Sequence, residues 1–418
     1  MRPVSVAVVG AGNRGAGYAR WILEHQDLAE VVAVAEPITA RRALLEAEHG
    51  IAAENALEDW RELAARGRIA DAVLICTQDR MHVEPVLAFA ALGYHILLEK
   101  PMALDEASCR AIVDAVEAAD VILAVGHVLR YTPYTQALKT MLDAGRIGEI
   151  ISIQHLEPVG YWHQAHSFVR GNWRSSALSA SMLMAKSCHD LDWLQHIVGQ
   201  PPSRVSSFGR LSHFTPANRP AQAANRCVDC PLQDDCAYSA TRFYAKELAE
   251  GRHGWPLSVV IERPTTAALD QALREGPYGC CVYACDNDAV DHQVVAMEFA
   301  SGATATFTMT AFTEMADRRT QIFGTRGELH GDGETIRVHD FRSGEWQTID
   351  SGARAAMSAA EGHGGGDGEL MGAFVRAVAT GDRTLVRSGA RESLRSHLAV
   401  LAAERSRIAG TVETVTDH

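Results

Sequence analysis

The sequence lacks an apolar run long enough to cross a membrane, and it also lacks an excess of basic residues. Its 39 Lys and Arg stand against 52 Asp and Glu, which gives a net charge of −13. Because phosphate backbones and anionic lipids repel an acidic surface, we expect a small-molecule partner and neither nucleic acid nor membrane. An apolar strand begins at residue 4 and leaves no room for a signal peptide, so we expect a cytoplasmic protein.

The chain is longer than one ordinary domain. Its 418 residues, 47% of them apolar, are enough for two domains with large cores. The pattern changes near residue 128, and we therefore predict one domain over residues 1–128 and another over 129–418. Disulfide bonds are not expected in a reducing compartment, so the nine cysteines are assigned to packing, metal binding or chemistry.

A glycine-rich turn follows the first apolar run. Residues 4–9 lead directly into Gly10-Ala11-Gly12-Asn13-Arg14-Gly15, and a helical pattern comes next. In a dinucleotide-binding fold, Gly10 permits the tight turn, Gly12 lets the backbone approach the pyrophosphate, and Gly15 allows close packing of helix on strand. The start of the helix then faces the phosphate charge, so this segment predicts a cofactor site.

The second apolar run ends at an acidic residue, which bears on the choice of cofactor. Glu36 follows residues 31–35 and is placed to accept hydrogen bonds from the ribose hydroxyls. Its carboxylate disfavours the additional phosphate of NADP, although the nearby Arg41 and Arg42 can offset that repulsion. The sequence therefore predicts NAD and leaves NADP open.

Short β-branched runs alternate with helical stretches up to about residue 125, a pattern typical of an α/β, doubly wound parallel sheet. The expected strands are Val4–Val9, Val31–Ala35, Ala72–Cys76, His95–Leu98 and Val121–Gly126. Ligands bind such sheets beyond the carboxyl ends of the strands. The glycine turn and Glu36 are therefore expected to share one crevice with the residues at the other strand ends. Those residues are Thr77, Glu99, Lys100, Pro101 and His127.

In the second half of the chain, apolar and polar residues alternate as they do in a β-strand with one buried face. The segments with this pattern are Ile150–Leu156, Gln293–Phe299 and Ala303–Thr310. They predict a C-terminal α+β domain with a large, mostly antiparallel sheet, whose free face is available to pair subunits in a homodimer or homotetramer. A polar, cysteine-rich stretch at residues 212–285 reads as an insertion, and a long helix is expected over Leu370–Ala409.

Two clusters carry groups suited to acid–base chemistry. Lys100 follows a buried strand, where its amine can hold an oxygen or exchange its proton during hydride transfer; an exposed lysine at a strand end is the alternative. His189 and Asp192 lie three residues apart on an expected helix face, where the carboxylate would orient the imidazole. A helix start with capping carboxylates and a histidine in the core is the alternative there.

A polar and aromatic segment between residues 160 and 174 is expected to line a ligand site. Aromatic faces stack on sugar rings, and guanidinium groups bind anionic substituents. The candidate substrate residues are Tyr161, His166, Arg170, Trp173 and Arg174, together with Arg130. A loop packed by its own aromatic residues is the alternative.

Five motifs occur in one order along the chain: Gly10–Gly15, Thr77 with His82, Glu99–Pro101, Val125–Tyr131 and Gly145–Ile150. In that order and spacing the sequence resembles the Gfo/Idh/MocA oxidoreductases, in which a Rossmann domain precedes a sheet domain that carries the substrate site. The resemblance implies that Lys100 lies near the nicotinamide, that His189 shuttles the proton, and that Thr77 and His82 belong to the cofactor site.

The chain also departs from the family pattern. Ala185 stands where the family usually has an aspartate, and Lys186 is expected to take over that polar role. His127 replaces an asparagine, and Ser179–Met182 replaces a glycine-rich approach to the histidine. Substrate handling is therefore expected to differ from that of the polyol and inositol dehydrogenases.

The leading functional hypothesis is an NAD(P)-dependent oxidoreductase acting on a hydroxyl or keto carbon of a sugar, sugar derivative or cyclic polyol. The resemblance supplies an alternative, an NAD-dependent glycoside hydrolase that oxidises, eliminates, hydrates and re-reduces its substrate. His363, in His363-Gly364-Gly365-Gly366-Asp367, is placed to close over such a site or else belongs to a flexible linker. A third hypothesis is a regulatory protein that binds dinucleotide without turnover.

The insertion supplies candidate metal ligands. Cys227-x-x-Cys230 places two thiols on one turn, Cys236 follows, and Cys285 is the expected fourth ligand. Four thiolates hold a structural zinc ion or an iron–sulfur cluster, and either holds together a segment with little core of its own. Packing of reduced cysteines is the alternative.

Overall fold

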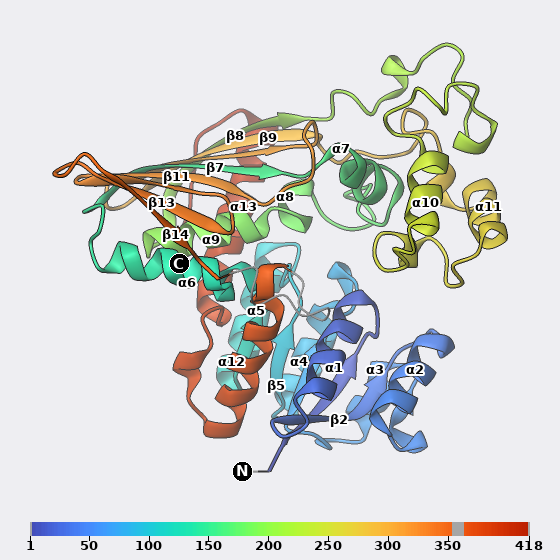
Figure 1. Cartoon of the computed structure of the whole chain (residues 1–418). Helices are drawn as coiled ribbons and strands as arrows, with labels where there is room; N and C mark the ends of the chain where they lie inside the picture. Colours follow the sequence, from blue (N-terminus) through green and yellow to red (C-terminus); the bar gives the residue numbers. More distant parts are fainter. Residues whose placement is uncertain (1, 353–362, 417–418) are drawn as a thin grey trace.

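Two sheets joined by helices organise the chain (Figure 1). The computed structural model describes residues 2–352 and 363–416. The first sheet has six strands in the order β3-β2-β1-β4-β5-β6, and the second has nine in the order β14-β13-β12-β11-β7-β10-β9-β8-β15. The first is parallel throughout and the second is antiparallel except where β7 meets β10. The expected fold class is therefore confirmed.

The parallel sheet is buried on both faces, which explains its nearly continuous apolar strands. Its strands are β1 (Val4–Val9), β2 (Ala29–Ala35), β3 (Ala56–Leu57), β4 (Ala72–Ile75), β5 (His95–Leu98) and β6 (Leu123–Val125). The helices between them are α1 (Asn13–Glu24), α2 (Thr39–His49), α3 (Trp60–Ala65), α4 (Val83–Ala91) and α5 (Glu106–Ala118). The short β3 is the one strand of this sheet that the sequence pattern does not predict.

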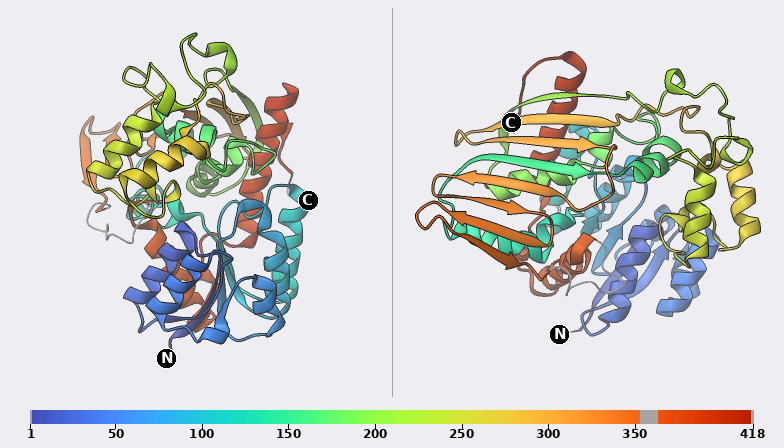
Figure 2. Two further views of the ribbon diagram at one scale, coloured as in Figure 1. Left: turned by 90° about the vertical axis from the view of Figure 1, so that its right-hand side faces the viewer. Right: turned by 45° about the horizontal axis from the view of Figure 1, so that its top comes forward.

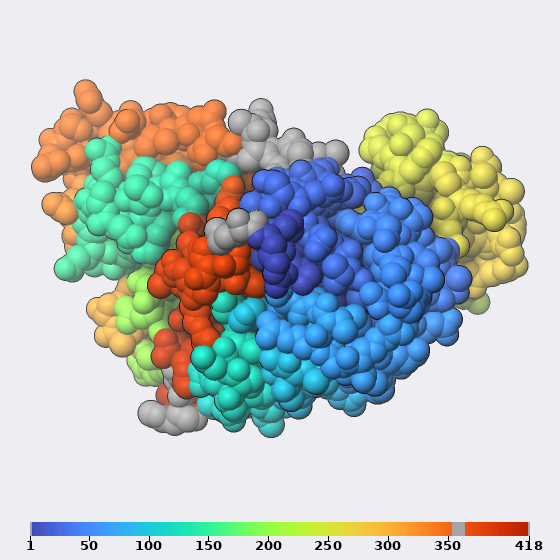
Figure 3. Space-filling model, turned by 90° about the horizontal axis from the view of Figure 1, so that it is seen from below, coloured from blue at the N-terminus to red at the C-terminus, as the bar shows by residue number. Residues whose placement is uncertain are grey.

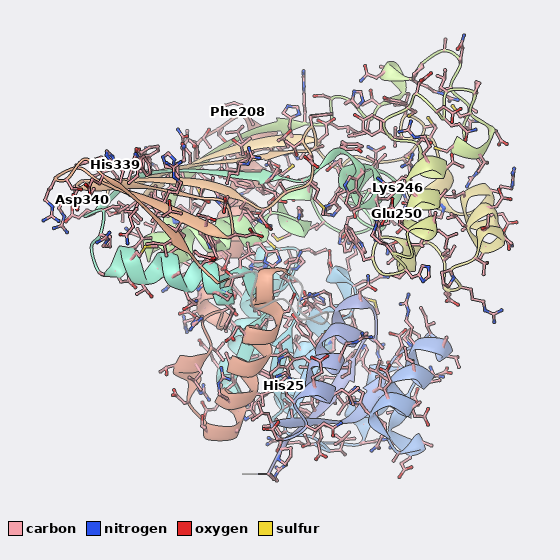
Figure 4. The ribbon with its side chains drawn as sticks, in the orientation of Figure 1. His25, Phe208, Lys246, Glu250, His339 and Asp340 are labelled. Carbon is pink, nitrogen blue, oxygen red and sulfur yellow. The ribbon has the colours of Figure 1, made fainter. Side chains whose placement is uncertain are left out.

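The larger sheet has helices on one face and an open second face (Figure 2). Its strands are β7 (Ile150–Pro158), β8 (Pro202–Arg210), β9 (His292–Phe299), β10 (Thr304–Thr310), β11 (Arg319–Gly324), β12 (Gly327–Gly331), β13 (Thr335–Asp340), β14 (Trp346–Asp350) and β15 (Glu413–Thr414). The helices that pack beneath it include α6 (Pro133–Asp143), α8 (Met182–Ala185) and α9 (Cys188–Val198). Phe208, labelled in Figure 4, is 70% exposed on β8.

The C-terminal segment forms two helices where the sequence pattern predicts one. Helix α12 (Gly366–Thr380) ends at Gly381, whose positive φ of +73° breaks the run, and α13 (Ala390–Ala409) begins after a short connection. Phe374 on α12 joins the core of the parallel sheet. Helix α13 contributes Leu398 to that domain and Ala403 to the core under the larger sheet. These two helices therefore fix the two sheets against each other.

The insertion occupies the connection between β8 and β9 and forms a lobe beside the parallel-sheet domain (Figure 3). It contains α10 (Ala240–Ala249) and α11 (Thr266–Glu275). Figure 4 labels Lys246 on α10 and Glu250 directly after its end. Tyr244, Leu257 and Leu269 form part of its own small core. Across residues 2–352 and 363–416, none of the helices has the length and apolar character needed to cross a membrane.

Candidate active site

The glycine turn after β1 has the geometry of a dinucleotide cradle. Gly10 has φ +90°, and a β carbon on it would lie 2.7 Å from the Cys76 carbonyl oxygen. A β carbon on Gly15 would lie 2.0 Å from the Gly10 carbonyl oxygen, so both glycines are required by packing. A β carbon on Gly12 meets no described protein atom within 4 Å. The space in front of Gly12 is therefore open.

The start of α1 is prepared for an anion. The helix begins at Asn13, no side chain caps it, and its first turn carries no acidic residue. Its first amides therefore lack helical acceptors and point toward the space in front of the glycine turn. Arg14 instead turns into the protein, where Nε donates to Glu99 Oε1 at 2.7 Å and a terminal nitrogen pairs with Asp367. The backbone amides of this turn, rather than the Arg14 side chain, are thus left without a carboxylate partner.

Glu36 ties the glycine turn to the end of β2. Its carboxylate accepts from the amides of Ala11 at 2.7 Å and Ile38 at 2.9 Å, and each oxygen keeps a lone pair for a ribose hydroxyl. Arg42 donates to the carbonyl oxygen of Glu36 and pairs with Glu58 at 2.9 Å. The positive charge of Arg42, which could offset the repulsion of an NADP phosphate, is therefore already neutralised by Glu58.

The Glu99–Pro101 segment follows β5 and contacts the larger domain through Lys100. Burial raises the pKa of Glu99, but the charge of Arg14 and a hydrogen bond from Tyr18 outweigh it, so this pKa lies below its ordinary value. Lys100 Nζ donates to the carbonyl oxygen of Ala185 at 2.8 Å. That carbonyl belongs to the larger domain and lies four residues before His189. The lysine from the first domain thus reaches the segment that carries the histidine of the second.

His82 lies behind these loops. Its Nδ1 is 2.8 Å from the carbonyl oxygen of Pro101, and its Nε2 is 3.1 Å from that of Thr77. The side chain is fully buried, so it braces the two loops of the expected cofactor site from within the protein. That His82 belongs to the cofactor site stays a prediction.

Asp192 and Arg130 form a buried ion pair. Arg130 Nε donates to one carboxylate oxygen at 2.7 Å and Nη2 to the other at 2.8 Å, while Nη1 donates to the Arg387 carbonyl at 2.6 Å. Both oxygens of Asp192 therefore accept from Arg130, which is itself 3% exposed. That Asp192 orients His189 and that Arg130 binds an anionic substituent stay predictions.

His127 lies beside His189. The two ring centres are 5.9 Å apart, and His127 Nδ1 is 3.7 Å from Asp192 Oδ2. Burial lowers the pKa of His127 to about 3, so the ring is neutral at pH 7. Within the described residues neither of its ring nitrogens has a hydrogen-bond partner. His189, on the first turn of α9, is 4% exposed.

Lys186 belongs to a charged network that the sequence pattern does not predict. Lys186 Nζ pairs with Glu157 Oε1 at 3.0 Å, and Arg318 Nε lies 2.6 Å from Glu157 Oε2. Arg318 also donates to Asp190 at 2.9 Å, and His155 Nε2 lies 3.2 Å from the same carboxylate. Burial lowers the pKa of Lys186 even though Glu157 opposes it. The sequence could have indicated Glu157 as a site residue, because it directly follows the expected strand Ile150–Leu156. No sequence pattern indicates Arg318.

Three expected substrate residues anchor the insertion instead. His166 Nδ1 lies 2.6 Å from the Tyr244 hydroxyl. Arg170 Nε donates to the Cys280 carbonyl at 2.7 Å, and Arg174 pairs with Asp286 at 2.7 Å. The polar and aromatic segment therefore docks the insertion, and substrate binding by these three residues stays a prediction.

Trp173, Tyr161 and His363 complete the expected substrate set. The Trp173 indole donates to Asp79 at 3.1 Å, so it bridges the two domains. Tyr161, on the short helix α7 (Tyr161–His163), is 41% exposed and lines a cavity of about 510 Å³ that it shares with α10. The side chain of His363 lies outside the described residues.

Three of the four cysteines expected as metal ligands line one cavity of the insertion. One cavity of about 340 Å³ is lined by Cys227, Cys230, Cys236 and Cys281, and we call it the cysteine cavity. Cys285 is not among its lining residues, and its Sγ donates to the Cys281 carbonyl at 3.3 Å. In the described part of the chain, no three His, Cys, Asp or Glu side chains are grouped to hold a metal ion. The expected tetrahedral zinc site with Cys285 as a ligand is therefore not supported.

The fold and the site together define a two-domain, dinucleotide-binding oxidoreductase. The chain belongs to the Gfo/Idh/MocA oxidoreductase family. The family model described as the NAD-binding Rossmann fold matches residues 4–127, and the model of the C-terminal alpha/beta domain matches residues 139–414. The resemblance noted from the sequence motifs is confirmed.

Relatives and solved structures agree with this membership. A 2,7-anhydro-N-acetylneuraminate hydratase of Escherichia coli is 27% identical over 65% of this chain and 68% of its own length. An inositol 2-dehydrogenase of Streptomyces avermitilis is 32% identical over 49% of this chain and 55% of its own length. A structure of levoglucosan dehydrogenase with NADH and levoglucosan has a TM-score of 0.72 at 18% identity and covers 99% of both chains. The chain spans between about half and two thirds of the length of the curated relatives it matches.

Proposed function

We propose that this protein transfers a hydride between NAD and a hydroxyl or keto carbon of a sugar, sugar derivative or cyclic polyol. The contact of Lys100 Nζ with the Ala185 carbonyl carries the proposal, because it sets the amine of one domain beside the segment that leads into His189. The inositol dehydrogenase relative and the levoglucosan dehydrogenase structure support the substrate class.

NAD supplies the hydride acceptor when it is bound. The glycine turn and the uncapped start of α1 hold the pyrophosphate, and Glu36 accepts from the ribose. The charge of Glu36 and the engagement of Arg42 with Glu58 favour NAD over NADP. In this proposal Lys100 holds the substrate oxygen, His189 takes up or returns its proton, and Lys186 with Glu157 presents polar groups to the neighbouring hydroxyls.

The direct test combines a substrate panel with a lysine variant. The purified protein is incubated with NAD and a set of free sugars and polyols while reduced nicotinamide is followed by absorbance. Lys100→Met should lower kcat/KM on the identified substrate by roughly 100-fold or more, because the group that handles the oxygen is lost, while NAD still binds. The matched control is Lys139→Met on α6, which removes an amine paired with Asp143 on the protein surface. Full turnover by Lys100→Met would remove the basis of the proposed role.

A second candidate function is favoured by the hydratase relative. The addition of water, as that relative's name states, leaves no net change of oxidation state, in line with transient oxidation and NAD recycled within the site. Chromogenic glycosides distinguish the two candidates. Release of the aglycone that requires NAD without accumulating NADH would establish the hydrolytic reaction. NADH that grows in step with an oxidised product would establish the dehydrogenase. The homodimer or homotetramer expected from the open sheet face stays a prediction.

A further inference from the structure

A cavity of about 510 Å³ lies between α10 of the insertion and α7 of the larger domain, and we call it the α10 cavity. Four aromatic side chains are among those that line it: Tyr161, Trp162, Phe243 and Trp255. Trp162 stacks on Phe243 at 4.9 Å, and its ring centre lies 5.5 Å from that of Trp255. Tyr161 and Trp255 are each 41% exposed, although rings of this size are usually well covered. Aromatic surface is therefore open to a ligand in this cavity.

The α10 cavity also carries basic side chains. Arg242 and Lys246 line it and lie four residues apart on α10, so they share one face of the helix. Like charges at this spacing repel each other and destabilise a helix. Across residues 2–352 and 363–416 neither side chain forms an ion pair with a carboxylate, whereas the nearby Arg252 pairs with Glu247 and Glu250. Two positive charges at the cavity are thus left for a negative partner.

These two charges differ from the character of the chain as a whole, which carries a net charge of −13. An anion is repelled by most of such a surface and attracted to the α10 cavity. Guanidinium and ammonium groups bind carboxylate and phosphate, and an aromatic wall packs against the face of a ring. The chemistry of the cavity therefore suits a ring compound that bears an anionic substituent.

The α10 cavity lies next to the segment that carries the proposed catalytic groups. Trp255 contacts His163 edge to face, with ring centres 5.0 Å apart. Burial lowers the pKa of His163, and the positive charge of Lys186 lowers it further, so the two side chains are close neighbours. One imidazole thus separates the cavity wall from Lys186, which pairs with Glu157 at 3.0 Å.

We propose that the α10 cavity binds an anionic sugar residue, so that the substrate is a saccharide or glycoside with an acidic group remote from the reacting carbon. This inference rests on the proposed function, which supplies the sugar ring and the position of the reacting carbon near Lys100. The aromatic side chains cover the ring of the acidic residue, and Arg242 with Lys246 pairs with its carboxylate or phosphate.

Calorimetry on the full-length protein tests the proposal with three probes, which are glucuronate, glucose 6-phosphate and glucose. Each is titrated up to about 50 mM, because single sugar residues bind weakly. At least one acidic probe should bind about 5-fold more tightly than glucose, and its affinity should fall as salt is added. The probe that shows this preference identifies the anion as a carboxylate or a phosphate. Equal affinities for all three probes, or no binding of any, overturns the proposal.

Neutral variants of α10 locate the binding. Lys246→Gln should weaken the preferred acidic probe about 5-fold, and the double variant with Arg242→Gln should abolish its preference over glucose. Both side chains are exposed, so the fold should be kept, and circular dichroism checks this. The matched control is Arg274→Gln on α11, an exposed cation paired with Asp270 outside the cavity lining, which should bind as wild type. Equal weakening by Lys246→Gln and Arg274→Gln overturns the assignment to this cavity.

The Lys100→Met variant separates this inference from the proposed function. It should bind the acidic probe as the wild type does, because Lys100 does not line the α10 cavity. Full turnover by Lys100→Met together with binding that depends on Lys246 would overturn the proposed function alone. With an active wild type, Lys246→Gln should raise KM for a disaccharide that contains the acidic residue and change kcat by less than about 3-fold. An unchanged KM would overturn the cavity assignment alone.

Discussion

The buried pair of Asp192 and Arg130 yields a prediction that separates a structural from a catalytic role for this carboxylate. The two side chains are 1% and 4% exposed and are joined by hydrogen bonds of 2.7 and 2.8 Å. Asp192→Asn keeps the shape of the side chain but leaves the guanidinium without a counter-ion in a dry interior. Removing one partner of a buried pair costs about 3–5 kcal/mol, and we expect the free energy of unfolding to fall by that amount.

Urea unfolding at pH 7 measures this loss, and turnover is measured in parallel under conditions where the variant stays folded. If Asp192 acts through Arg130, kcat should change by less than about 10-fold, a transition-state loss below about 1.4 kcal/mol. The double variant Arg130→Met with Asp192→Leu should recover much of the stability, because no charge is then left unpaired. Asp286→Asn, which removes the exposed partner of Arg174, serves as a control and should cost no more than about 1 kcal/mol.

The opposite outcome would refute this reasoning. If Asp192→Asn unfolds at the wild-type urea concentration and kcat falls by roughly 100-fold or more, the carboxylate acts in catalysis, as its spacing from His189 suggests in the sequence. A double variant no more stable than Asp192→Asn alone would show that the loss does not come from the uncompensated charge of Arg130.

Two further predictions follow from the cofactor site and its buried histidine. Gly12→Ala should leave the unfolding free energy of the apo protein within about 0.5 kcal/mol but weaken NAD binding at least about 10-fold by calorimetry, whereas Gly10→Ala should also destabilise the fold. Because burial lowers the pKa of His127 to about 3, its contribution is complete above about pH 6.5 and declines below it by about 1.4 kcal/mol per pH unit. His127→Asn should reduce the slope in urea unfolding between pH 7 and 5 by up to that amount, while other buried histidines such as His397, whose pKa burial lowers to about 4, keep the remainder; an unchanged slope contradicts the assignment.

The fold could be predicted where periodicity is local. The strand over His95–Leu98 is found with its predicted bounds, and β7 continues the predicted run by two residues to Pro158. The break between α12 and α13 was missed because helical spacing persists on both sides of Gly381. The strand β3 was missed because two residues carry no periodic signal.

The site could be predicted only where a motif is contiguous. The Glu-Lys-Pro element predicts Lys100 just beyond a strand of the parallel sheet, and there it contacts the Ala185 carbonyl of the larger domain. The pair of Arg130 and Asp192 is separated by 62 residues, and Arg318 lies 128 residues from Asp190. Such partners are brought together by the folding of the larger domain, and no local spacing in the sequence predicts that packing.

The segment over residues 160–174 shows why a substrate wall and a docking surface look alike in sequence. Both need aromatic faces and guanidinium groups, and here Arg170 uses its donors on the carbonyls of the insertion. The segment nevertheless starts three residues after Glu157, the partner of Lys186, and Trp162 within it stacks on Phe243 of α10 at 4.9 Å. The insertion is therefore joined through one short stretch of backbone to the charged network beside the proposed catalytic residues.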